Sequence, residues 1–300
     1  MTAEQAEVGF YIPFWGRPDY LEAAVKSVME QTDPRWTLTV VNDAHPDQSV
    51  DRYFETLDDP RVRYVRLEEN IGITANFRYC AHLATEPLVV ILGYDDLLLP
   101  GYAATVLRAR EVHPTATIIQ PGVRVIDEDG QPVTTLVDTV KQRLLRPAAP
   151  DPVLLRGDRL AAGLMTGNWL YWPSLAFARD SLKAQDFRDE FTVIQDLALI
   201  LDLLISGGTV LVVDAQVFCY RRHTASASSA ELVDGSRFAG ERKFFELARS
   251  LSGDVGCNRT RRAARIHLTS RLHALVLVPR ALRTGDARGL RHLVRHVMGA

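Results

Sequence analysis

The chain has 300 residues, of which 47% are hydrophobic, so it can bury a large core as one domain or as one domain with an appendage. Its net charge of −2 gives no basis for binding nucleic acid. Cys80, Cys219 and Cys257 have no metal-ligand spacing and predict reduced thiols in a cytosolic protein. The first residues do not resemble a signal peptide, and no stretch approaches the roughly 18 to 20 apolar residues of a membrane span.

Strands and helices alternate regularly through the first 120 residues. Near-continuous apolar runs predict strands buried on both faces, and amphipathic stretches between them predict helices. This alternation is typical of βαβ units with a parallel sheet. The predicted strands are 8–13, 37–42, 62–67, 88–92 and 117–120, and the predicted helices are 20–31 (with a capping box at Asp19 and Glu22), 48–57, 73–84 and 101–113.

The pattern changes after residue 120. It predicts a hairpin over 123–133, an irregular region over 134–156, a partly extended aromatic segment over 168–179, a helix over 196–206 and strands at 209–213 and 216–221. From residue 237 the sequence is mostly helical, and residues 256–300 hold ten arginines and one acid. We therefore expect an α/β domain over 1–230, with halves of about 1–120 and 121–230, and a helical, basic C-terminal extension over 231–300.

Polar side chains follow several of the predicted strands, at the edge where open α/β sheets bind their ligands. The first strand is followed by "PFWGRPDY", the second by "NDAHPD", the third by "EENIGITANFR" and the fourth by "GYDDLLLP". Neither a glycine-rich dinucleotide motif nor a P-loop is present. The adjacent carboxylates of Asp95 and Asp96 instead predict a divalent cation, Mg²⁺ or Mn²⁺, of the kind that bridges protein carboxylates to phosphates.

Six segments in order resemble the family-2 glycosyltransferases, which are inverting enzymes with the GT-A fold. They are "YIPFWGRPDYLEAAVKSVMEQT", "VVNDAHPD", "ENIGITANFR", "ILGYDDLLLP", "IQDLALILDLLISGG" and "YRRHTASASS", and they span about residues 8 to 228. The resemblance implies a mostly parallel central sheet flanked by helices. It also implies transfer of a sugar from a nucleotide-diphosphate sugar to an acceptor hydroxyl, with inversion at the anomeric carbon.

The same resemblance implies roles for particular residues. Asp196 matches the catalytic base, although Gln195 stands where the family usually has a further acid. Asp96 is favoured as the direct metal ligand, with Asp95 nearer the ribose and Gly93 where many relatives have another aspartate. The donor-binding residues would be Pro13, Arg17, Asp43, Asn70, Gly72, Asn76, Asp95, Arg221 and Arg222; the metal ligands Asp95, Asp96 and His223; and the acceptor wall Asn168, Trp169 and Trp172.

Several alternatives stay open at this point. The donor nucleotide is of the UDP, dTDP or GDP type, and the acceptor is a saccharide, a lipid-linked glycan or a natural product. A sugar-1-phosphate nucleotidyltransferase shares this layout, and a nucleotide- or glycan-binding module with a decayed site would explain Gly93 and Gln195. The C-terminal helices are interpreted as a solvated packing element, a homodimer contact or a peripheral membrane contact. The last interpretation would place a cytoplasmic protein at the inner face of the membrane.

Overall fold

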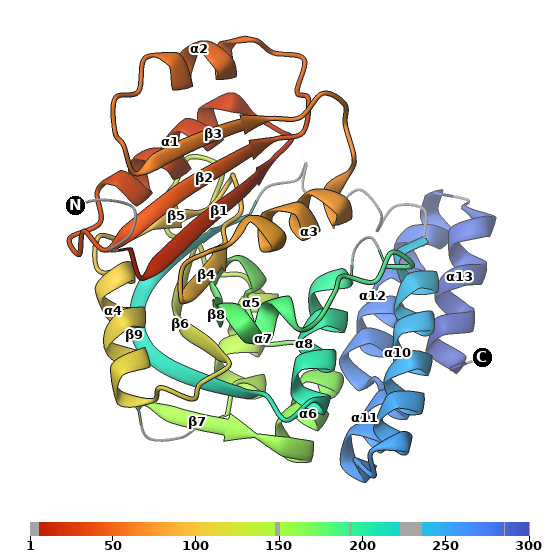
Figure 1. Cartoon of the computed structure of the whole chain (residues 1–300). Coiled ribbons are helices and arrows are strands. Elements are labelled where there is room, and N and C mark those ends of the chain that lie inside the picture. Colours follow the sequence, from red (N-terminus) through yellow and green to blue (C-terminus); the bar gives the residue numbers. More distant parts are fainter. Residues whose placement is uncertain (1–5, 148–150, 192–193, 223–235, 285, 300) are drawn as a thin grey trace.

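The computed structural model describes residues 6–147, 151–191, 194–222, 236–284 and 286–299 (Figure 1). The first half of the chain alternates strands and helices as predicted, because each parallel pair of strands needs a crossover connection. Its elements are β1 (Val8–Phe14), α1 (Pro18–Met29), β2 (Trp36–Asn42), α2 (Ser49–Glu55), β3 (Val62–Arg66), α3 (Ile73–Leu83), β4 (Leu88–Ile91), β5 (Leu97–Leu98) and α4 (Tyr102–Val112). The strands β3, β2, β1 and β4 lie side by side in that order, all parallel.

The second half extends this sheet with antiparallel as well as parallel pairs. Its elements are β6 (Ile118–Ile126), α5 (Leu136–Val140), a π-helical turn (Lys141–Leu145), β7 (Val153–Arg156), α6 (Gly157–Thr166), β8 (Ala176–Ala178), α7 (Arg179–Lys183), α8 (Gln195–Ile205) and β9 (Thr209–Arg221). Strand β8 is antiparallel to both β4 and β6, whereas β6 and β9 are parallel. The sheet is therefore mixed, and the predicted parallel order applies to its first four strands.

One long strand, β9, replaces the two strands predicted at 209–213 and 216–221. It pairs with β6 along its whole length, with a register shift at Gly122. A side chain at Gly122 could not fit there, because its Cβ would lie 2.4 Å from the backbone oxygen of Asp214. Close approach of the two backbones at this glycine allows β9 to bend and remain in the sheet.

Apolar residues cover both faces of the sheet. Helices α1, α2 and α4 pack on one face around Phe10 and Leu38. Helices α3, α6, α7 and α8 pack on the other face around Ile91 and Phe177. Burial on both faces explains why the central strands read as apolar runs instead of alternating patterns.

The C-terminal region is helical, as predicted, and packs against the α6 and α8 side of the molecule (Figure 1). Its helices are α10 (Ser236–Asp254), α11 (Asn258–Ile266), α12 (Leu268–Thr284) and α13 (Ala287–Met298). The carboxylate of Asp158 on α6 accepts hydrogen bonds from the backbone N–H groups of Arg259 (2.9 Å) and Thr260 (2.8 Å), which satisfies the first turn of α11. Phe244 and Ala264 share the core of the sheet domain.

Two local predictions differ from the structure. Helix α1 begins at Pro18, with Arg17 as N-cap and no side-chain cap, so the capping box predicted at Asp19 and Glu22 is wrong. Proline suits the first helical position because its missing N–H would have no partner there. The hairpin predicted over 123–133 is present but short: Ile126 and Pro132 form an antiparallel bridge, and the backbone N–H of Val133 donates to Val125 (3.0 Å). Its turn contains Gly130 with a φ of +81°.

A substitution at Phe218 tests how strongly the loop between β4 and β5 depends on this core. Phe218 is fully buried on β9, opposite Leu98 of β5, so truncation to alanine leaves a cavity beneath the loop that joins β4 to β5. We expect Phe218→Ala to lower the free energy of unfolding by about 3–5 kcal/mol in urea titrations. The exposed Val112→Ala control should stay within about 0.5 kcal/mol of the wild type. A similar small effect for Phe218→Ala would contradict this packing.

Candidate active site

The loop after β2 meets the loop before α3. This contact was predicted, because both loops follow parallel strands that end at the same edge of the sheet. The buried carboxylate of Asp43 accepts hydrogen bonds from the backbone N–H groups of Ile71 (2.7 Å) and Gly72 (3.0 Å). The side chain of Asn70 donates to the backbone oxygen of Asp43 (3.2 Å). Gly72 has a φ of +82°, which a residue with a side chain would rarely adopt. Asp43, Asn70 and Gly72 therefore form one rigid loop junction, and contact of Asp43 with a nucleoside stays a prediction.

Three more residues predicted on the donor side differ in exposure. Pro13 is buried within β1. Asn76 is 2% exposed and donates to the backbone oxygen of Val41 (3.3 Å), so it fixes α3 against β2. Arg17 is exposed, is paired with Asp19 (3.0 Å) and lies over the ring of Tyr20. Pro13 and Asn76 are buried, and their predicted donor contacts stay predictions.

The loop between β4 and β5 carries the two adjacent carboxylates. Asp96 is 2% exposed, and its Oδ1 accepts the backbone N–H of Arg221 at 2.8 Å. Burial and the neighbouring charge of Asp95 raise the pKa of Asp96 well above its usual value. A Cβ on Gly93 would lie 2.6 Å from Oδ2 of Asp96 and 2.9 Å from Oδ1 of Asp95. Both carboxylates therefore turn toward Gly93, and only Asp95 is partly exposed.

Arg221 holds this loop from the opposite side. It is 6% exposed, and its guanidinium donates to the backbone oxygens of Asp95 (2.7 Å), Asp127 (3.1 Å) and Glu128 (2.8 Å). These contacts give Arg221 a structural role, in contrast to the predicted phosphate contact. The adjacent Arg222 is partly exposed, and His223 lies outside the described residues.

A second group of charged side chains lies next to this loop. Arg222 forms a two-pronged ion pair with Asp138 (2.8 Å for both hydrogen bonds), and Asp138 also accepts from the hydroxyl of Tyr171 (2.9 Å). Lys141, from the π-helical turn, places its amine 4.9 Å from the centre of the Tyr171 ring. Burial lowers the pKa of Lys141 to about 8. The sequence pattern predicts an irregular region here and contains no signal that selects Lys141.

Asp196 lies at the start of α8, within the electrostatic reach of this group. Its Oδ1 accepts the backbone N–H of Leu197 (2.7 Å). Burial raises the pKa of Asp196, and the charges of Lys141 and Arg237 act in the opposite direction. A raised pKa suits a carboxylate that takes up a proton during a reaction. The neighbouring Gln195 is 3% exposed, and its side-chain oxygen has no hydrogen-bond partner among the described residues.

Electrostatic contacts connect the two carboxylate sites. Burial raises the pKa of Tyr220, and the charges of Asp96, Asp95 and Asp138 raise it further. The charge of Arg222 acts in the opposite direction. The pKa of Lys141, which burial lowers, is lowered further by the charge of Arg222 and raised by the charges of Asp138 and Asp196. The pair Asp95–Asp96 and the single carboxylate Asp196 thus lie at two ends of one continuous charged region.

The predicted aromatic acceptor wall is wrong. Trp169 and Trp172 are 3% and 9% exposed, and both belong to the apolar core beneath the sheet. The ring of Trp172 lies near Phe77 and Phe187. Asn168 accepts the backbone N–H of Leu170 (3.1 Å), which is a local turn contact. Buried rings cannot stack on a sugar, so these side chains stabilise the fold.

An exposed aromatic residue that sequence analysis did not select lies at the same sheet edge as Asp43. Trp15 directly follows β1 and is 49% exposed, with its ring centre 5.1 Å from that of His45. Phe14 packs between His45 (5.1 Å) and Tyr94 (5.6 Å) beneath it. The sequence contains this signal, because "PFW" leads from the first strand into the first loop of the binding edge. Trp15 offers a flat apolar surface to a ligand.

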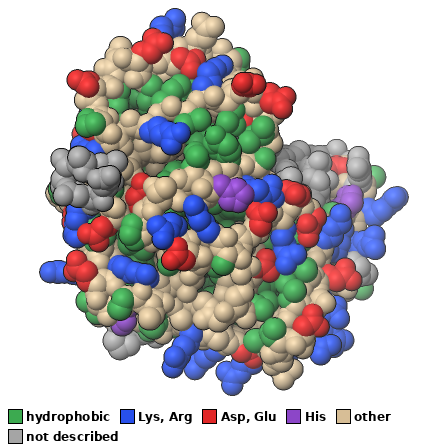
Figure 2. All heavy atoms as spheres, viewed as in Figure 1, with side chains coloured by type: hydrophobic (Ala, Val, Ile, Leu, Met, Phe, Trp, Pro, Cys, Tyr) green, Lys and Arg blue, Asp and Glu red, His purple; other side chains and the backbone are tan. Residues whose placement is uncertain are grey.

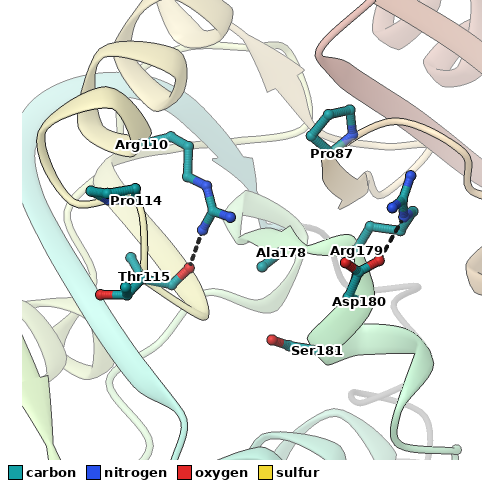
Figure 3. A pocket seen from close by; sticks show the side chains of 9 residues that line it. Pro87, Arg110, Pro114, Thr115, Ala178, Arg179, Asp180 and Ser181 are labelled. Carbon is teal, nitrogen blue, oxygen red and sulfur yellow. Dashed lines mark hydrogen bonds and ion pairs between the residues drawn. The ribbon is translucent and has the colours of Figure 1, made fainter.

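A cavity of about 260 Å³ lies away from these residues (Figure 3). Pro87 precedes β4, and Thr115 precedes β6, so the cavity opens at the opposite end of those strands. Its charged side chains already have partners: Arg110 donates to the backbone oxygen of Ala116 (2.8 Å), and Arg179 pairs with Asp180 (2.9 Å). This cavity is therefore separate from the charged region around Asp95 and Asp196.

The sequence and fold have known relatives. Residues 10–156 match the family model of glycosyl transferase family 2. The chain is 25% identical to the uncharacterized protein MT1568 of Mycobacterium tuberculosis over 74% of this chain and 69% of the relative. It is 32% identical to the putative teichuronic acid biosynthesis glycosyltransferase TuaG of Bacillus subtilis, over 32% of this chain and 38% of TuaG.

The fold has a close structural counterpart. A crystal structure of Staphylococcus aureus TarS, residues 1–349, superimposes with a TM-score of 0.70 at 14% identity, covering 97% of this chain and 81% of that one. At this identity the likeness shows the fold, a GT-A-like mixed sheet flanked by helices with a helical C-terminal region. The matched family model and the glycosyltransferase relative agree that residues 10–156 form a glycosyl transferase family 2 domain.

Proposed function

We propose that this protein is an inverting, metal-assisted glycosyltransferase that takes a nucleotide-diphosphate sugar as donor. One observation carries the proposal: the paired carboxylates of Asp95 and Asp96 and the single carboxylate of Asp196 lie at opposite ends of one charged region. The donor's diphosphate would bind at the end with Asp95 and Asp96, and the acceptor hydroxyl would bind at the end with Asp196. The TarS structure contains UDP-GlcNAc, which makes a UDP-sugar the first donor to test.

The donor end fits a divalent cation through Asp95. Mg²⁺ and Mn²⁺ accept a few carboxylates together with water and phosphate oxygens. Among the described residues no group of three or more metal-ligating side chains is present, so protein ligands alone would not complete such a site. Asp95 is partly exposed, whereas Asp96 is buried and already accepts the backbone N–H of Arg221. We therefore assign the metal contact to Asp95, in place of the Asp96 that sequence favoured.

A cation at this place would neutralise charge on the departing nucleoside diphosphate. The side chains of this chain supply the rest of the donor site. Trp15 offers its exposed face to the base, and the Asp43 junction holds the loop beside it. Arg222 is partly exposed and lies near Tyr220, where it adds positive charge to the same region. These groups bind and orient the donor before any bond changes.

Asp196 is the general base of the proposed reaction. Its carboxylate takes the proton of the acceptor hydroxyl as that oxygen forms a bond to the anomeric carbon. The bond from the anomeric carbon to the phosphate oxygen breaks, and its electron pair leaves with the nucleoside diphosphate. A retaining double displacement would need a second carboxylate as nucleophile. The residue beside Asp196 is Gln195, and Asp138 is held by Arg222 and Tyr171. A single displacement with inversion follows.

The assignment of the metal contact predicts different behaviour for two adjacent variants. We expect Mn²⁺ and UDP together, at about 100 times the dissociation constant, to add about 2.7 kcal/mol of stability in a thermal-shift assay. Asp95→Asn should lose the part of this shift that depends on Mn²⁺. Asp96→Asn should retain it, because the amide oxygen can still accept the Arg221 N–H. Loss of the shift in Asp96→Asn alone would return the contact to Asp96. The same panel with dTDP and GDP identifies the nucleotide.

Substitution of the base should separate catalysis from binding. We expect Asp196→Asn to reduce the turnover of sugar transfer by about 10² to 10⁴-fold, because proton removal is lost. The nucleotide-dependent thermal shift should remain. If transfer continues at the wild-type rate, another group is the base; if no transfer occurs even in the wild type while nucleotide binds, the binding-module alternative is correct.

The pH profile tests the influence of Lys141 on that base. Activity should fall as the pH drops through the raised pKa of Asp196, since only the ionised carboxylate accepts a proton. Lys141 lowers this pKa through its charge, so Lys141→Met should move the acidic limb of kcat/KM to higher pH. Lys141→Arg keeps the charge and should leave the limb near its wild-type position. An unmoved limb in Lys141→Met would show that the lysine does not act on the base.

Trp15 tests the nucleoside end of the site. Stacking of a base on an aromatic side chain contributes about 1–3 kcal/mol, so Trp15→Ala should weaken UDP binding by about 5- to 150-fold. Trp15→Phe keeps an aromatic ring and should lose much less affinity. Isothermal titration calorimetry measures both constants. Equal affinity in Trp15→Ala and wild type would place the base elsewhere on the sheet edge.

A further inference from the structure

Helix α12 is apolar on two sides. Its inner side carries Ala274, Leu277 and Ala281, which pack with Phe238 of α10 and Leu293 of α13. Its outer side carries a second set of apolar residues that remain about half to three-quarters exposed, namely Leu268, Leu272, Leu275, Val276 and Leu282. A helix that is apolar all round is normally buried all round. The outer set therefore lacks cover from the described part of the chain.

These outer residues form a continuous strip. Their spacing of three, four and seven residues places them along one side of the helix. The strip extends over 15 residues, and its first and last residues are about 21 Å apart along the helix at 1.5 Å per residue. Ile266, at the end of α11, is 43% exposed and precedes the strip directly. An apolar strip of this length differs from the isolated exposed leucines that any protein carries.

Arginines precede, interrupt and follow the strip along the chain. Arg262 and Arg265 on α11 and Arg283 on α12 are exposed, and Arg271 is partly exposed. Figure 2 shows basic side chains, with acidic ones among them, at the right-hand side of the molecule, where the C-terminal helices lie. In residues 256–300 the single acid, Asp286, caps α13 by accepting the backbone N–H of Gly289 (2.8 Å). A second copy of the chain would place arginine opposite arginine, which favours an anionic occupant over self-association.

The helix does not have the form of a membrane span. Among the described helices, none is long and apolar enough to cross a bilayer. An exposed apolar strip bordered by arginine is instead typical of a helix that lies in the plane of the lipid headgroups. Apolar side chains enter the acyl boundary there, and the guanidinium groups contact lipid phosphates.

We propose that the outer strip of α12, bordered by Arg265, Arg271 and Arg283, docks this protein on the surface of a bilayer that contains anionic lipid. The helix begins beside the acceptor end of the active-site region. The Oγ1 hydroxyl of Thr269 donates to the backbone oxygen of Thr166 (2.7 Å). A Cβ on Gly167 would meet both Thr269 (3.0 Å) and Leu145 (2.6 Å), the last residue of the turn that carries Lys141. Docking thus brings the acceptor end close to the lipid surface.

Vesicle flotation tests this surface on the full chain. The vesicles contain either phosphatidylcholine alone or phosphatidylcholine mixed with phosphatidylglycerol. We expect the wild type to float with the anionic vesicles only, and the bound fraction to fall as salt is raised. The double variant Leu272→Gln, Leu275→Gln should bind at least about tenfold more weakly, because two apolar side chains no longer enter the bilayer. The exposed Val112→Gln variant on α4 is the matched control and should bind like the wild type.

Three results would overturn the proposal. The wild type could fail to bind anionic vesicles at low salt. The double variant could bind as tightly as the wild type, which would show that arginine charge acts without the strip. Sedimentation velocity without lipid could show a dimer that the double variant disrupts, which would identify a second copy as the cover. Circular dichroism and the UDP–Mn²⁺ thermal shift of the double variant should match the wild type, so a failure of docking is distinguishable from a failure of the glycosyltransferase assignment.

Discussion

Arg221 is the residue on which the geometry of the active-site region depends most. Its backbone N–H holds the carboxylate of Asp96, and its guanidinium joins the backbone of Asp95 to the turn at Asp127 and Glu128. The end of β9 is thereby fastened to two loops that are distant in sequence. A buried cation bonded to three backbone oxygens is also costly to release, since each oxygen would be left without a donor. The position of Asp95 is therefore set by β9.

The sequence predicts the first half of the fold well because that half is built from local signals. The strands β1, β2 and β4 are short, mostly apolar runs, the edge strand β3 alternates apolar residues with arginine, and each intervening helix has an apolar side. The second half depends on contacts between distant segments. The short strand β8 pairs with both β4 and β6, and its three residues carry no periodicity that would separate a strand from a loop. The bend that keeps β9 in one piece depends on backbone packing at Gly122.

The site was predictable where a strand end determines it. Asp43, Asn70 and Gly72 meet because parallel strands end at one edge, and Asp95 and Asp96 follow β4 for the same reason. Residue type was a poor guide where burial decides whether a side chain can contact a ligand. Trp169 and Trp172 are as suited to a core as to a sugar surface, and only their exposure separates the two. Lys141 could not be selected from sequence, because its setting is created by Asp138, Arg222 and Asp196 from other elements.

Gly93 limits how the metal end of this site can vary. The family resemblance implies an aspartate at this place in many members. In this chain the space beside the Gly93 backbone is filled by the carboxylates of Asp95 and Asp96, which would lie 2.9 Å and 2.6 Å from any Cβ. The glycine and the inward turn of both carboxylates are therefore one coupled arrangement. An aspartate at position 93 would require the two carboxylates to turn away, and movement of Asp96 would release the backbone N–H of Arg221, so a change at this position also alters the contacts of Asp96.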